Sequence, residues 1–185
     1  MQDGQEATME KSAEQRAILA QWMEDVQSYE LPAWESLPTL QLYMDQVVTL
    51  VTGYLGFLST VGEEKPLTSS MINNYVKLGL LRPPVKKRYT RAHLACLIMI
   101  CLLKRALSMA ALRTLLPREM DDAEIAGLYE LFRASCRRAA DRTAEQVGAW
   151  SDPFYAEGAD DAGRTLVMRL ALESAICKAG AEKII

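Results

Sequence analysis

The chain has 185 residues, of which 50% are hydrophobic and 24% charged, and this balance supports a packed core and excludes a disordered or fibrous protein. Its net charge is −3, and its first residues are polar and acidic where a secretory signal needs basic and then apolar ones. The longest apolar run, Leu94 to Leu103, has about half of the ~20 residues that span a bilayer. We therefore expect a cytoplasmic protein without membrane association.

The charge is distributed unevenly along the chain. Residues 67–116 carry nine basic side chains and no aspartate or glutamate, so this block has a charge of +9 and the rest of the chain −12. The nine are Lys77, Arg82, Lys86, Lys87, Arg88, Arg91, Lys104, Arg105 and Arg113. Such a block is typical of a surface that faces a polyanion, because each phosphate that it neutralises releases condensed counterions. Charge alone leaves open a solvated face that the acidic remainder balances.

Two helices are expected before the basic block. Residues 1–35 are acidic with scattered apolar positions, and they predict one amphipathic helix from about Glu10 to Tyr29. The two prolines of ELPAWESLPT end it, and a second helix is expected from near Pro38 to a turn at Gly62–Pro66, over about five turns. Its apolar positions recur at steps of three and four residues: Leu40, Tyr43, Val47, Val51, Tyr54, Leu55 and Leu58.

A short helix and an extended segment open the basic block. Thr68 is a suitable N-cap for a helix that closes at Gly79, since glycine supplies the left-handed conformation that ends helices. The chain then turns through Arg82-Pro83-Pro84, and Val85 to Tyr89 is expected to be short and extended.

Two further helices complete this block. Thr90 is expected to cap a helix that continues to about Ala106, with apolar residues on its buried side. Ser108 is expected to cap a short helix that stops before Pro117, because proline cannot continue it.

The C-terminal third predicts two more helices. Asp121 or Asp122 caps the first, which we expect to reach as far as Val147 with an apolar stripe of about three turns, too short for a long coiled coil. A loop follows at Ser151–Asp161, and the last helix is expected from about Ala162 to Ala179. Met168, Leu172, Ala175, Ile176 and Ala179 recur along it.

The helix after Thr68 carries the most informative pattern. Ser70, Asn73, Asn74 and Lys77 fall at positions i, i+3, i+4 and i+7, so all four point from one face. Asparagine is a poor helix former, and two adjacent asparagines weaken a short helix unless an outside contact rewards them. An asparagine amide can make two hydrogen bonds to an adenine edge, and lysine can meet phosphate. An ordinary polar surface face is the alternative.

The surrounding sequence supports the first interpretation through a resemblance. The stretch LTSSMINNYVKLGLLRPPVKKRYTRAHLACLIMICLLKRALSMAALRTLL resembles the N-terminal domain of MerR-type regulators. The resemblance is carried by Tyr75 to Leu81 at the end of a recognition helix, Pro83 to Tyr89 as a wing, His93-Leu94 at a helix start, and Ser108 to Leu112. The strings MINNYVK and KKRYT are similar to the bacterial DUF1836 family, and the similarity covers about residues 36–116.

The resemblance implies an all-α protein with a MerR-like winged helix-turn-helix core, a very short wing and an appended C-terminal helical region. Residues 68–78 would form the recognition helix, with Ser70, Asn73 and Asn74 as candidates for base contacts. The candidates for phosphate contacts are Lys77, Arg82, Lys86, Lys87, Arg88, Tyr89 and Arg91.

The sequence offers little that supports an enzyme, a cofactor or a metal site. The four cysteines form no C-x-x-C pair and there is one histidine, so the spacing of a zinc site is missing. His93 is expected to cap or pack a helix. Asp121-Asp122 and Asp160-Asp161 stand at expected helix starts, where acidic residues interact favourably with the helix dipole.

We therefore expect a sequence-specific double-stranded DNA-binding protein, a transcriptional regulator rather than an enzyme. Its parts would be an acidic N-terminal segment (1–35), the DNA-binding domain (36–116) and a helical region (117–185) through which a homodimer forms. The alternative is a protein-interaction module whose basic face docks an acidic partner. Three tryptophans outside the basic block, Trp22, Trp34 and Trp150, either line a pocket for an unknown small-molecule effector or simply pack.

Overall fold

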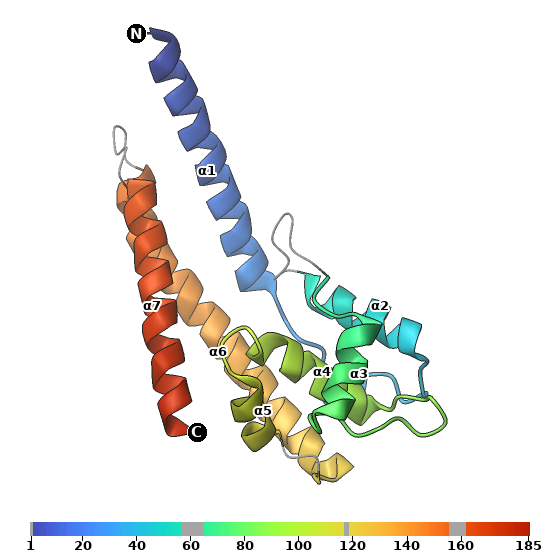
Figure 1. Ribbon diagram of the computed structural model, residues 1–185. Coiled ribbons are helices and arrows are strands. Elements are labelled where there is room, and N and C mark those ends of the chain that lie inside the picture. Colours follow the sequence, from blue (N-terminus) through green and yellow to red (C-terminus); the bar gives the residue numbers. More distant parts are fainter. Residues whose placement is uncertain (1, 57–64, 117–118, 156–161) are drawn as a thin grey trace. The chain divides into compact units, whose positions relative to one another are not determined.

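The computed structural model describes residues 2–56, 65–116, 119–155 and 162–185. These residues form seven α-helices and one 3₁₀ helix, and β-type pairing among them is limited to two isolated bridges (Figure 1). The expected all-α class is therefore confirmed. No helix of this part of the chain is both long and apolar enough to cross a membrane.

The contacts divide the chain into two compact units. One comprises Glu30–Cys136 with Ile176–Ile185, and the other comprises the chain up to Tyr29 with Arg137–Ala175. The helices are α1 (Gln2–Ser28), η1 (Trp34–Ser36), α2 (Met44–Tyr54), α3 (Ser69–Lys77), α4 (Arg91–Leu103), α5 (Met109–Leu115), α6 (Asp122–Tyr155) and α7 (Ala162–Ile184). The expected domain limits at 35/36 and 116/117 remain predictions.

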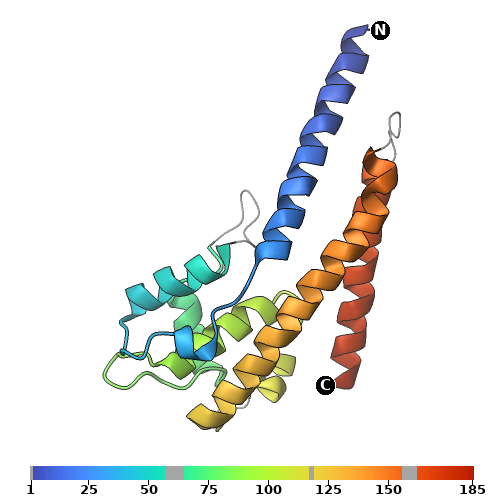
Figure 2. The same ribbon diagram turned by 180° about the vertical axis from the view of Figure 1, so that it is seen from behind.

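Helix α4 is the centre of the first unit. It is apolar all round, so it has no solvent-facing side and must be enclosed by its neighbours. Its buried residues are Ala92, His93, Leu94, Ala95, Leu97, Ile98, Met99, Ile100 and Cys101. Helix α2 packs against both α4 and α3, and Figure 2 shows the same arrangement from behind. Burial raises the pKa of the Cys96 and Cys101 thiols to about 11, so both stay protonated near neutral pH.

The expected start of α2 near Pro38 was wrong. The helix begins at Met44, and Tyr43 before it has an extended backbone with φ −82° and ψ 164°. Leu42 is held outside the helix because it exchanges two backbone hydrogen bonds with Tyr89, each of 2.9 Å. Tyr43 is the N-cap, and its N–H donates to Oε1 of Gln46 at 2.8 Å. The helix ends at Tyr54, so the expected length of about five turns was also wrong. Leu58 and Gly62 lie outside the described residues.

Helix α3 starts and stops where the sequence predicted. Thr68 is the N-cap, and its Oγ1 accepts a hydrogen bond from the Met71 N–H at 3.2 Å. At the other end Gly79 has φ +72°, a conformation that residues with a side chain rarely adopt. The Leu80 N–H then donates back to the Tyr75 carbonyl at 2.9 Å, which closes the helix in a Schellman motif.

The other caps are also confirmed, with small shifts in helix length. Ser108 Oγ accepts from the Ala111 N–H at 3.2 Å at the start of α5. Asp121 Oδ1 accepts from the N–H groups of Ala123 and Glu124 at 2.8 and 2.9 Å at the start of α6. Helix α4 ends at Leu103 and not near Ala106.

The chain before α2 is held against the first part of α6, within the same unit. The Tyr129 hydroxyl donates to the Pro32 carbonyl at 2.8 Å, and the Trp34 N–H donates to Oε1 of Glu130 at 2.7 Å. The Trp34 and Tyr129 rings also meet, with centroids 6.4 Å apart. Trp34 therefore packs within this unit. Packing was one of the two roles expected for the tryptophans.

In the other unit, α7 runs antiparallel beside the second half of α6 (Figures 1 and 2). Helix α6 has 34 residues and continues to Tyr155, so the expected end near Val147 and the expected loop at Ser151 were wrong. The cause is continued burial, since Ala144, Val147 and Ser151 recur at three- and four-residue steps. Helices α1 and α7 also exceed their expected bounds, α1 by starting at Gln2 and α7 by ending at Ile184.

His93 caps α4 from inside the core. Its Nδ1 accepts a hydrogen bond from the Thr90 N–H at 3.1 Å, so this nitrogen is unprotonated and the ring is neutral. Burial lowers the pKa of His93 below its usual 6.5, and the positive charge of Arg82 acts in the same direction. Between the lowered pKa of the folded chain and the usual 6.5 of the unfolded chain, the unfolded chain therefore binds a proton that the folded chain does not.

This difference predicts a stability that depends on pH between 7.0 and 5.5. As the pH falls from 7.0 to 5.5, the free energy of unfolding should decrease, by no more than about 1.4 kcal/mol per pH unit because one proton is involved. His93→Gln keeps an acceptor for the Thr90 N–H and does not titrate, so its free energy of unfolding should stay nearly constant over this interval. Urea unfolding at several pH values measures both proteins. Parallel pH profiles for the two would contradict the account.

Candidate nucleic-acid interface

The polar face of α3 is presented to solvent as the spacing predicted. Ser70, Asn73, Asn74 and Lys77 are all exposed, while Ile72 and Tyr75 are buried on the opposite side. The four exposed residues line one shallow surface depression together with Met71. The structure therefore brings together the three candidates for base contacts and the first candidate for a phosphate contact.

The wing, Pro83 to Tyr89, is a minimal hairpin and not the extended segment that was expected. Val85 and Arg88 form an antiparallel bridge, and the Arg88 N–H donates to the Val85 carbonyl at 2.9 Å. Two residues, Lys86 and Lys87, make the turn between them, with φ values of +50° and +61°. Positive φ at both central positions is the mark of a type I′ turn, the tight connection that suits the twist of paired strands.

Lysine is an unusual choice for both positions of this turn. Asn-Gly and Asp-Gly dominate type I′ turns, because a side chain in the left-handed region collides with the following carbonyl at about 1–2 kcal/mol per residue. Lys86 and Lys87 nevertheless occupy it, and both are exposed. Backbone strain of this kind concentrates at functional positions. The turn thus keeps two ammonium groups at its tip at the expense of local stability.

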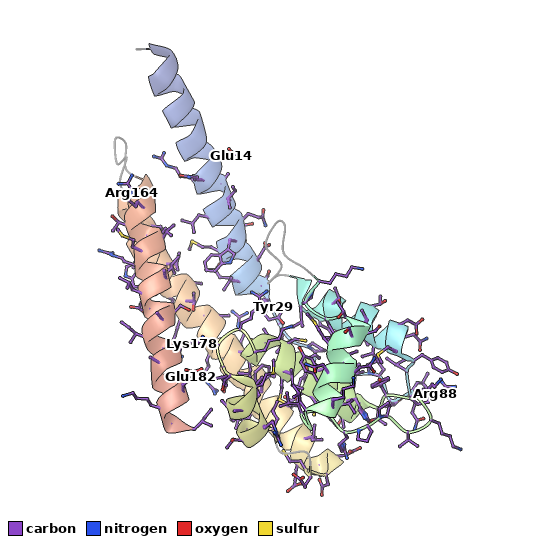
Figure 3. The ribbon with its side chains drawn as sticks, viewed as in Figure 1. Glu14, Tyr29, Arg88, Arg164, Lys178 and Glu182 are labelled. Carbon is purple, nitrogen blue, oxygen red and sulfur yellow. The ribbon has the colours of Figure 1, made fainter. Side chains whose placement is uncertain are left out.

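Arg88 is held in place by a neighbouring aromatic ring. Its guanidinium carbon lies 3.8 Å from the centre of the Tyr43 ring, and its Nη1 donates to the Gln41 carbonyl at 3.5 Å. Figure 3 shows Arg88 at the outer edge of the wing. Tyr43 was expected inside a helix, and its role was missed. A usable signal was present in Tyr43-Met44-Asp45-Gln46, since glutamine at the third helical position often marks a helix start.

Three of the candidates for phosphate contacts have other partners in the structure. Arg82 Nη2 lies 2.6 Å from Oδ1 of Asp122, and Arg91 Nη1 lies 3.1 Å from Oε2 of Glu35. Arg91 Nε also donates to the Leu37 carbonyl at 3.0 Å. The Tyr89 side chain is 2% exposed and meets the ring of His93 edge-on, with centroids 5.5 Å apart.

The remaining candidates keep their charge uncompensated. Lys77, Lys86, Lys87 and Arg88 form no ion pair within the part of the chain that the structure describes. All four lie between positions 77 and 88 of the sequence. In Figure 1 the wing leaves the end of α3 that carries Lys77. The described residues also contain no cluster of histidine, cysteine and carboxylate groups suited to a metal ion.

Comparison with known families identifies the family of this chain. The family model named Domain of unknown function (DUF1836) matches residues 32–132. The chain belongs to the DUF1836 family. The match begins at Pro32 and ends just beyond Tyr129, so the hydrogen bond between these two residues joins the two ends of the DUF1836 domain. Neither the curated proteins nor the solved structures gave a significant match.

The strained turn predicts a different change in stability for two substitutions at one position. Lys87→Gly removes the collision at positive φ, and after the added entropy of the unfolded chain it should raise the free energy of unfolding by about 0.5–1 kcal/mol. Lys87→Ala loses the same ammonium group but keeps a Cβ, so its stability should stay within about 0.5 kcal/mol of the original. Urea unfolding distinguishes them, and equal stability of the two variants would refute the strain.

Proposed function

We propose that this DUF1836 protein is a sequence-specific double-stranded DNA-binding protein, a transcriptional regulator of MerR-like type that acts in the cytoplasm. In this proposal α2 and α3 form the helix-turn-helix, with α3 in the major groove and the wing on the adjacent backbone. The observation that carries it is the depression on α3, where Ser70, Asn73 and Asn74 are exposed beside Lys77.

The chemistry of the depression fits base edges better than an acidic protein surface. Asn73 and Asn74 are neutral, and each amide offers a donor and an acceptor, the pair that an adenine edge accepts in the major groove. An acidic partner would favour positive charge across the whole face. The uncompensated cations instead stand at its end, at Lys77, and in the wing, where they suit phosphates that position the protein without specifying sequence.

We also propose that the protein acts as a homodimer. One α3 covers a single half-site, and operators are usually contacted by two symmetric recognition helices. Helix α7 carries an apolar stripe along its own length that is open to solvent, with Met168, Leu172 and Ile176 each more than half exposed. Exposed apolar stripes of this kind mark association surfaces. A second copy would cover the stripe in a symmetric interface.

Selection of a preferred site from random duplexes tests specificity and symmetry together. The selected site should be an inverted repeat with half-sites about 10 bp apart or a multiple of that distance. Asn73→Ala or Asn74→Ala should lower the affinity for this site by about 1–3 kcal/mol and leave the affinity for a scrambled duplex unchanged, because an amide contributes no charge.

Two matched variants control this experiment. Thr114→Ala removes an exposed polar group from α5, which lies in the basic block but is not the proposed recognition helix, and should keep the full preference. Leu172→Glu places a charge in the α7 stripe and should restrict binding to one half-site. If both asparagine variants keep the full preference, the assignment of α3 is wrong. If the chain selects no sequence and binds polyglutamate as tightly as duplex, the protein-interaction alternative is right.

A further inference from the structure

One arginine of the wing differs from the other arginines near it in how its charge is used. Arg82 and Arg91 are paired with Asp122 and Glu35, so their charges are neutralised within the protein. Arg88 forms no ion pair among the described residues and lies over an aromatic ring instead. A stacked guanidinium is fixed in orientation while its charge and most of its N–H donors remain free for a ligand.

The ring under Arg88 is itself fixed by its main chain. The Tyr43 N–H is bonded to Oε1 of Gln46, and the preceding Leu42 is paired with Tyr89. The Tyr43 side chain is 47% exposed, so a ring of this size is not required to fill the core. The guanidinium carbon of Arg88 lies 3.8 Å from the centre of this ring. These contacts favour one role for the Tyr43 ring, which is to orient the Arg88 side chain.

An exposed apolar side chain borders this pair. Val85 lies directly across the bridge from Arg88, so the two side chains share one face of the hairpin. Val85 is 71% exposed. A valine side chain has no hydrogen-bond acceptor, so it leaves the guanidinium N–H groups available to a ligand. The planar fork of arginine matches two oxygens of one phosphate.

We propose that Tyr43 is a positioning residue for DNA binding: its ring orients Arg88 so that the guanidinium binds one backbone phosphate through two hydrogen bonds. The proposal rests on the duplex binding proposed above. It gives the very short wing a fixed phosphate contact, whereas Lys86 and Lys87 at the tip contribute mobile charges. A phosphate carries no sequence information, so this contact acts equally on every duplex.

A double-mutant cycle on the full chain tests whether Tyr43 acts through Arg88. Tyr43→Leu should weaken binding about fivefold, on the selected and the scrambled duplex alike, because the guanidinium loses its cation–π partner. Tyr43→Phe keeps the ring and should bind within about twofold of the original. In an Arg88→Ala background, Tyr43→Leu should have almost no further effect, since the group that it orients is gone.

Arg113→Ala provides the matched control for the cycle. Arg113 is an exposed arginine of the same basic block on α5, so its removal changes the net charge equally. In that background Tyr43→Leu should still weaken binding about fivefold, because independent sites add. Thermal unfolding midpoints within about 2 °C of the original show that the variants are folded. Arg88→Lys keeps the charge without the fork and should resemble Tyr43→Leu.

Any other result would contradict the proposal, and each result shows which step of it fails. If Tyr43→Leu binds as the original does, or is additive with Arg88→Ala, Tyr43 does not act through Arg88. If Tyr43→Phe is as weak as Tyr43→Leu, the hydroxyl is the contact and the stacking is incidental. If the loss is confined to the selected sequence, Arg88 contacts a base and not a phosphate. If the original protein binds no duplex, the proposed function itself fails, and this inference fails with it.

Discussion

Two backbone hydrogen bonds join Leu42, just before α2, to Tyr89, at the end of the wing. They keep the chain extended up to Tyr43, so α2 begins at Met44. They also bring Tyr89 into the core, where its ring meets His93 at the start of α4. The wing therefore emerges from a fixed base although it has only two turn residues. The same pairing places Tyr43 next to Arg88, which gives the wing its one oriented cation.

Features that depend on neighbouring residues were predictable from the sequence. Thr68 and Ser108 were recognised as caps because a hydroxyl before an apolar periodic segment satisfies N–H groups three residues away. Gly79 was recognised as a helix end because few other residues adopt positive φ. The shared face of Asn73 and Asn74 followed from helical geometry alone. The site on α3 was therefore visible before the structure.

Features that depend on distant residues were not predictable. Leu42 and Tyr89 are far apart in the sequence, and nothing near Leu42 shows that it is withheld from a helix. Arg82 and Arg91 find their carboxylates 40 and 56 residues away, so composition counted their charges as available. Helix α6 passes Val147 because Ser151, one turn further on, is still buried, while the local composition favoured a loop. The structure thus reduces the candidate cations to those without an internal carboxylate.

The two kinds of group that the proposed DNA interface would use are separated on this surface. Neutral side chains with paired donors and acceptors lie on α3, and uncompensated charges lie at its end and in the wing. The strain at Lys86 and Lys87 indicates that the wing is shaped for presenting charge and not for stability. If the chain binds DNA as proposed, such a division would allow sequence preference and overall affinity to be changed independently.

The salt dependence of duplex binding tests the central claim most directly. The affinity of the full chain for a mixed-sequence duplex would be measured from about 50 to 300 mM salt, where phosphate contacts dominate non-specific binding. If Lys77, Lys86, Lys87 and Arg88 each neutralise one phosphate, log K should fall against log salt with a slope of about −3.6 for each protomer bound. A slope near zero, or no binding at the lowest salt, would contradict the account.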